Sequence, residues 1–104
     1  MKADIKRYHK WVSEQPCVLC KIEGNSQVCH YTGMDGHMFG RGRGKKAHHL
    51  MVFPACQDCH SMVDNYRQFV HPDRFTQKLL HSSGVLVFIG QTLISAYEEG
   101  VLKL

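Results

Sequence analysis

The chain has 104 residues, of which 43% are hydrophobic and 21% charged; these proportions are ordinary for one globular domain and exclude a wholly disordered chain. At this length a hydrophobic core alone leaves a small margin of stability, so a bound metal would matter. The formal charge of +4, with eight histidines counted as neutral, gives a mildly basic surface of the kind that meets phosphates.

The first predicted element is an amphipathic helix over residues 4–13. Its apolar side chains recur at helical spacing and comprise Ile5, Tyr8, Trp11 and Val12. Pro16 ends the helix, because proline disfavours the helical conformation of the residue before it. The segment lacks the apolar stretch of a signal peptide, and the longest apolar run, residues 85–89, is too short to span a bilayer. We expect a cytoplasmic protein with no membrane contact.

A first cysteine pair follows this helix, and residues 27–31 then form a predicted strand that carries Cys29 and His30. The segment 32–46 contains five glycines and is predicted to be a mobile basic loop. Its cations could lie along a phosphate backbone, or the loop could simply be solvated; they are Arg41, Arg43, Lys45 and Lys46. If they bind DNA, the affinity should fall steeply with salt concentration, and these contacts should give little sequence preference.

Residues 49–53 are apolar and partly β-branched, which predicts a second strand that pairs with the first in a hairpin. A second cysteine pair leads into a predicted helix from near Gln57 to the residues before 71–72. Two further helices are predicted, from Pro72 to about Leu80 and from about Phe88 to Glu99, with Gly100 as the final cap. Residues 85–89 are ambiguous between strand and helix.

Two Cys-x-x-Cys pairs from opposite ends of a loop indicate one structural zinc site with four thiolate ligands. The ligands are Cys17, Cys20, Cys56 and Cys59. The alternative is a set of buried free cysteines. The fifth cysteine, Cys29, is interpreted as a packed thiol, although an alternative ligand or part of a second metal site are also open.

The histidines between and after the two cysteine pairs suggest a second group of residues, with a catalytic role. His60 and Asp64 lie one helical turn apart and could hold one divalent ion, either Mg²⁺, Mn²⁺ or Zn²⁺. His30 could take a proton from water during phosphodiester hydrolysis, because the pKa of histidine lies near ~6.5. The alternatives are that His60 is a hydrogen-bond partner or an exposed helix residue, and that Asp64 is a solvated carboxylate.

The remaining histidines divide into two groups. His48 and His49 are adjacent, so on a strand only one of them would face the metal. We favour His49 for that position, whereas His48 could orient phosphate or a ligand. The others lack such a context and are predicted to be surface residues: His9, His37, His71 and His81.

The segments CVLC, VCHYTG and GRGRGKKAHHLMVFPACQDCH together resemble the HNH endonucleases with a zinc-stapled ββα-metal core. The resemblance covers about residues 16–64 and is strongest to small phage and prophage members, including the Ref-like recombination nucleases. It implies an α+β fold in which His30 is the general base, His60 a metal ligand and His49 the middle position of the motif.

The sequence departs from that family pattern at two positions. Cys29 stands where an aspartate or histidine often binds metal, and Asp64 stands where a second histidine is common. Both substitutes can bind metal, but a cysteine would favour zinc over magnesium.

We therefore expect one domain, with a nuclease-like core over residues 16–70 and helices over residues 72–100. The expected function is metal-dependent hydrolysis of DNA in phage or prophage recombination or processing, with a phage or recombination protein as a further partner. One alternative is a non-catalytic zinc-stapled module that binds DNA or acts as an adaptor. Another is a structural zinc domain that binds a protein through its C-terminal helices.

Overall fold

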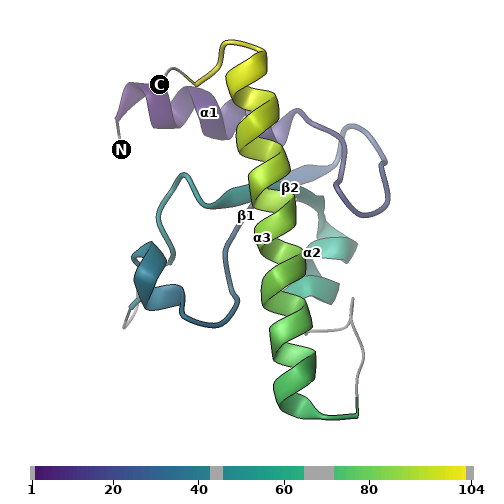
Figure 1. Cartoon of the computed structure of the whole chain (residues 1–104). Coiled ribbons are helices and arrows are strands. Elements are labelled where there is room, and N and C mark those ends of the chain that lie inside the picture. The colour runs from purple at the N-terminus through teal and green to yellow at the C-terminus, as the bar shows by residue number, and fades with distance from the viewer. Residues whose placement is uncertain (1, 43–45, 65–71, 103–104) are drawn as a thin grey trace.

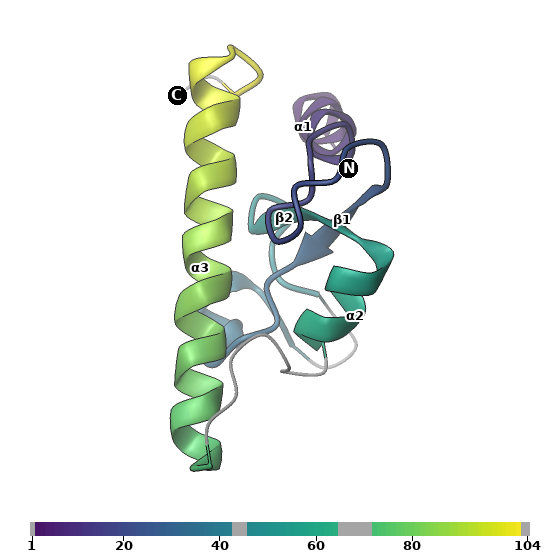
Figure 2. The same ribbon diagram turned by 90° about the vertical axis from the view of Figure 1, so that its right-hand side faces the viewer.

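A computed structural model describes residues 2–42, 46–64 and 72–102. The elements in chain order are α1 (Ala3–Ser13), β1 (Ser26–His30), the 3₁₀ helix η1 (Gly36–Phe39), β2 (Val52–Cys56), α2 (Gln57–Asp64) and α3 (Arg74–Glu98). Figure 1 shows the strands at the centre, with the long α3 crossing them. In Figure 2, α3 lies on one side of the strands and α2 on the other. The described residues form a small α+β structure.

The two strands form the predicted antiparallel hairpin, with Ser26 opposite Cys56 and His30 opposite Val52. The second strand begins later than predicted, because residues 48–51 form a turn: the N–H of Met51 donates to the carbonyl of His48 at 2.9 Å. The strand then continues through Pro54, which is tolerated because both strands of a two-stranded sheet are edges. The hairpin therefore brings residue 30 opposite the start of β2.

The core lies on both faces of β2, where Val52, Phe53 and Ala55 are fully buried. Phe53 and Ala55 pack in a cluster with Val85 and Ile89 of α3. Val52, on the other face, packs with Tyr8 and Val12 of α1 and Ala96 of α3. Because alternate residues of a strand point to opposite faces, β2 contributes to both clusters and packs against α1 as well as α3.

The prediction of two C-terminal helices is wrong, because α3 is continuous from Arg74 to Glu98. It also begins after Pro72, at an N-cap in which the carboxylate of Asp73 accepts from the N–H of Thr76 at 2.9 Å. Glycines 84 and 90 cost the helix about 1 kcal/mol each, and burial of Val85 and Ile89 against the sheet offsets this cost. Gly100, at φ 78°, lies just beyond the C-terminus, as predicted.

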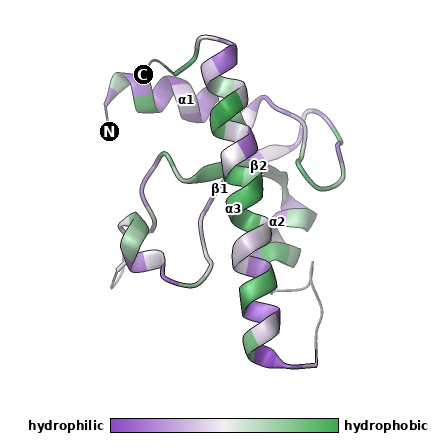
Figure 3. Ribbon diagram, viewed as in Figure 1, coloured by the Kyte–Doolittle hydropathy of each residue, from purple (hydrophilic) through white to green (hydrophobic). Residues whose placement is uncertain are grey.

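By length and composition α3 could cross a membrane, which the sequence analysis did not anticipate. One such helix is weak evidence of a span, because core helices of soluble proteins have the same properties, and 33% of the apolar stretch is buried in the protein. Figure 3 shows hydrophobic residues recurring along α3. Several of them are exposed, including Phe75, Leu79, Val87 and Ile94.

The segment predicted as a mobile loop carries η1 and is attached to α3. The hydroxyl of Ser82 accepts from the N–H of Met34 at 2.7 Å and donates to the carbonyl of Lys78 at 2.8 Å. A Cβ at residue 33 would lie less than 3.0 Å from the hydroxyls of Tyr31 and Ser82, so only glycine fits there. These contacts fix the first half of the loop beside the end of β1.

Candidate metal centre and active site

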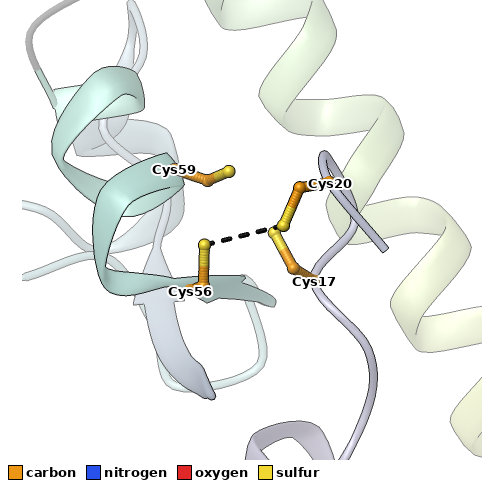
Figure 4. A group of neighbouring side chains, drawn as sticks. All are labelled: Cys17, Cys20, Cys56 and Cys59. Carbon is orange, nitrogen blue, oxygen red and sulfur yellow. Dashed lines mark hydrogen bonds between the residues drawn. The ribbon is translucent and has the colours of Figure 1, made fainter. Parts of the chain in front are cut away.

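The four paired cysteines converge on one point beside the hairpin. Cys17 and Cys20 lie in the turn after α1, Cys56 ends β2, and Cys59 lies in the first turn of α2. Figure 4 shows the four sulfur atoms directed toward one another, and all of them lie within 4.8 Å of each other. The predicted cysteine cluster is therefore present.

The spacing within this cluster fits a metal ion. The Sγ atoms of Cys20 and Cys56 are 3.7 Å apart. Zinc with tetrahedral Zn–S bonds of about 2.3 Å holds its sulfur atoms about 3.8 Å apart. A disulfide would bring them to about 2.05 Å. The four cysteines can thus hold a structural metal such as zinc.

Backbone geometry prepares the first pair for this role. Lys21 adopts the left-handed conformation, with φ 65°, and its N–H donates to the carbonyl of Cys17 at 2.9 Å. The N–H of Val18 donates to the carbonyl of Pro54 at 3.0 Å, which ties the turn to β2. The same turn therefore closes the cysteine pair and joins it to the strand that carries Cys56.

The surroundings of Cys17 and Cys59 shift the pKa values of their thiols in opposite directions. Burial acts to raise the pKa of the Cys17 thiol, but backbone N–H groups of Cys20, Cys56 and Leu19 outweigh burial and lower it to about 6. Burial raises the pKa of Cys59, and hydrogen bonds with the other cysteine side chains raise it further. The thiol of Cys17 is therefore deprotonated more readily than that of Cys59, and metal binding would release protons from the thiols.

His60 and Asp64 form the second pair of candidate ligands. Nδ1 of His60 lies 2.9 Å from Oε1 of Gln27, so an Nδ1–H would donate to Gln27 and, in the neutral ring, Nε2 would be the nitrogen available to a metal. That Nε2 lies 3.2 Å from Oδ2 of Asp64. Two ligand atoms on one zinc or magnesium ion lie about 3.0–3.4 Å apart. The pair fits a divalent ion as well as a simple ion pair.

The pair faces a cavity of about 310 Å³, which is also lined by His30, Arg41 and Lys46. Burial lowers the pKa of His30 to about 4, and the positive charge of Lys46 and of neighbouring histidines contributes to the shift. His30 is therefore neutral at physiological pH. A neutral imidazole, two groups that could bind a metal and two cations share one pocket.

His30 also contacts His49, which was predicted to face the metal but is not among the residues that line this pocket. Its Nε2 lies 3.3 Å from Nδ1 of His49, whereas His48 uses its Nδ1 to accept from the N–H of Leu50 at 3.1 Å. His9 of α1 completes a group of three ring nitrogens within 4.8 Å of one another. The prediction that His9 is a surface residue without context is wrong, because α1 packs against the hairpin beside His30.

One protein family matches a region of the chain that contains both the cysteine cluster and the histidine residues of the pocket. The family described as "Protein of unknown function (DUF968)" matches residues 1–82, which include every candidate ligand named above. The chain belongs to the DUF968 family. No curated protein and no solved structure matches it.

Of the basic residues predicted to meet DNA in this DUF968 chain, two line the pocket. Lys46 is exposed, and the Nη2 of Arg41 donates to the carbonyl of Gly33 at 3.0 Å, which directs Arg41 along the pocket wall. Arg43 and Lys45 lie outside the described residues. The described part of the basic segment thus contributes two cations to the candidate active site.

The surroundings of Cys29 and His81 in the DUF968 chain can also be compared with the predictions. Cys29 is 1% exposed and packs in the core, and burial raises the pKa of its thiol to about 12. Among the described residues it belongs to neither ligand cluster, which agrees with a packed thiol. His81, predicted to be exposed, is fully buried near Thr32, whose Oγ1 lies 3.3 Å from its Nε2. His71 lies outside the described residues.

Sequence reasoning missed Gln27 and His9. Gln27 projects from β1 toward α2 only because the hairpin register places it there, so its contact with His60 required the tertiary structure. His9 follows the buried Tyr8 in α1, and the helical pattern alone does not indicate what that edge of α1 meets. One signal could have identified Gln27. It is a polar residue in a strand whose neighbouring residues point to the core, and the strand lies beside a cysteine pair.

Proposed function

We propose that this DUF968 chain is a metal-dependent DNA endonuclease of the HNH type, with an ββα-metal core, that acts in phage or prophage DNA recombination or processing. The observation that supports the proposal most strongly is the shared pocket. It combines His30 from the end of β1, the His60–Asp64 pair from α2, and the cations Arg41 and Lys46.

In this proposal His30 is the general base. Its pKa, lowered to about 4 by burial and nearby positive charge, keeps the ring neutral and able to accept a proton from the attacking water. His49, 3.3 Å away through Nδ1, holds the ring in place. General base catalysis by a positioned histidine contributes about 10²–10⁴-fold to a rate.

His60 and Asp64 would hold a catalytic divalent metal, with the contact from Gln27 fixing the tautomer of His60. Such a metal, when bound, neutralises charge on the phosphate and on the leaving oxygen. Arg41 and Lys46 would bind phosphate oxygens at the open side of the pocket, which positions the backbone without reading its sequence. The four-cysteine site has no part in the chemistry and holds the hairpin to the preceding turn.

A plasmid-nicking assay with added Mg²⁺ or Mn²⁺ tests this function. The zinc-loaded wild type should nick DNA only when the second metal is added. His60→Ala should require at least about tenfold more metal, because mutating even a residue that only supports a metal ligand typically lowers metal affinity 10–100-fold. His37→Ala, in the exposed part of η1, is the matched control and should behave as wild type.

Absence of cleavage by the wild type with every metal and DNA form would contradict the proposal. Salt-sensitive DNA binding without cleavage would instead support a non-catalytic DNA-binding or adaptor module. A structural zinc domain that binds another protein through α3 is favoured by one observation, the exposed apolar side chains of that helix. It would be supported by the absence of both cleavage and DNA binding.

A further inference from the structure

Three histidine rings from three elements surround one point beside the proposed active site. His9 comes from α1, His30 from the end of β1, and His49 from the turn before β2. Their ring centroids are 5.5–5.8 Å apart in all three pairs, and the ring planes meet at 71–79°. The rings therefore stand edge to face around a common centre, rather than stacked.

The nitrogen atoms of this group have the spacing of metal ligands. Nε2 of His30 and Nδ1 of His49 are 3.3 Å apart, and two imidazole nitrogens on tetrahedral zinc lie about 3.3–3.4 Å apart. One nitrogen of His9 completes the set within 4.8 Å. Three imidazoles with an open fourth position form a donor set that suits zinc, nickel or copper.

Access and charge indicate a weaker site than the four-cysteine cluster. His49 is exposed, and His9 and His30 are half-buried, so a hydrated ion can reach all three rings. The nearby Lys46 opposes a cation and favours an anion in the fourth position. The three histidines are neutral ligands, so they offset less of the charge of the metal than four thiolates do.

We propose that His9, His30 and His49 form a second, exchangeable transition-metal site that takes Zn²⁺, and that its occupation inhibits the nuclease by engaging His30. Metal on one ring nitrogen leaves the proton on the other, so neither nitrogen can accept a proton from water. The inhibition rests on the proposed function, whereas the metal binding does not.

Binding is tested by calorimetric titration of Zn²⁺ into full-length protein that already carries one zinc, at pH 7.5. The wild type should take up a further equivalent that His60→Ala retains, which separates this step from any zinc on the His60–Asp64 pair, and His9→Gln should weaken it at least about tenfold. Glutamine retains a donor for the carbonyl of His49, which His9 now contacts through Nε2 at 2.7 Å. His37→Gln is the matched control and should bind as wild type.

The fold of each variant is checked by its melting temperature and by its retention of the first zinc. If His9→Gln is poorly folded, Co²⁺ absorption of the zinc-loaded wild type decides instead. A second equivalent bound by histidines should give d–d bands without the sulfur-to-cobalt charge-transfer absorption of the cysteine site. No second equivalent in the wild type, or equal affinity in His9→Gln, would overturn the proposal.

The inhibitory step is measured as the Zn²⁺ concentration that halves Mg²⁺-dependent nicking. His9→Gln should raise it at least about tenfold relative to wild type, and His37→Gln should leave it unchanged. If nicking persists at a Zn²⁺ concentration that fills the second site, the inhibition is wrong and the proposed function stands. If no protein nicks DNA at all, the proposed function fails, and the titration still decides the metal site.

Discussion

At the scale of single residues, the candidate site depends on contacts that set the protonation of each histidine. Gln27 fixes the tautomer of His60, and burial beside Lys46 keeps His30 neutral. The types of these residues could be predicted from the sequence, because histidines that follow cysteine pairs suggest metal chemistry. Their partners could not, since Gln27, His9 and Lys46 reach the histidines only through the hairpin register and the packing of α1.

His81 provides a pH-dependent prediction. Burial lowers its pKa, with a smaller opposing effect from Asp64. The unfolded chain therefore takes up the proton first, near the ordinary value of ~6.5, and the folded state loses stability as pH falls below that value. The free energy of unfolding should fall more steeply from pH 7.5 to 5.5 in wild type than in His81→Gln, as measured by urea denaturation. Equal slopes for the two proteins would contradict a buried neutral His81.

At the scale of elements, the four-cysteine site connects the turn after α1 to the junction of β2 and α2. The hairpin, α1 and the start of α2 follow from local patterns, and the sequence predicts them closely. The single helix α3 could not be predicted in the same way, because the two serines and the glycine at residues 82–84 are typical of a helix end. His81, Val85, Ile89, Thr92 and Ala96 nevertheless form one buried stripe at spacings of three and four residues, and tertiary packing stabilises the helix through the break.

Replacing Cys59 tests the role of this connection. Cys59→Ser should lose the bound zinc and unfold, because a site with three thiolates and a hydroxyl binds zinc far more weakly and the metal contributes to folding directly. His60→Ala is the neighbouring control and should retain both zinc and the fold, since the His60 side chain is 31% exposed. Zinc content and thermal melting are measured together. A Cys59→Ser protein that retains its zinc and its melting temperature would show that the ligand assignment is wrong.

At the scale of the whole molecule, the hairpin separates the four-cysteine site from the candidate DNA surface. The cysteines converge near Cys56 at one end of β2, whereas Arg41 and Lys46 line the pocket at the His30 end of β1. A net charge of +4 could be read from the sequence, but the position of Arg41 and Lys46 in this pocket could not. The path of residues 32–42 back across α3 places Arg41 there.

Salt dependence of DNA binding tests the placement of that surface. The logarithm of the association constant should fall linearly with the logarithm of salt concentration, and Lys46→Ala should reduce the slope by about 1 through loss of one phosphate contact. Lys78→Ala, on the exposed part of α3, should leave the slope unchanged. Fluorescence anisotropy with a short duplex measures both. Equal slopes for wild type and Lys46→Ala would place the DNA elsewhere.

The most direct test of the account is the single-turnover rate of plasmid nicking by zinc-loaded His30→Ala, compared with wild type and His37→Ala at equal zinc content. We predict that His30→Ala is slower by at least about 10²-fold, because it loses the general base while the four-cysteine site and the fold remain. His37→Ala should match wild type. A His30→Ala protein that nicks DNA at the wild-type rate would contradict the assignment of the chemistry to this pocket.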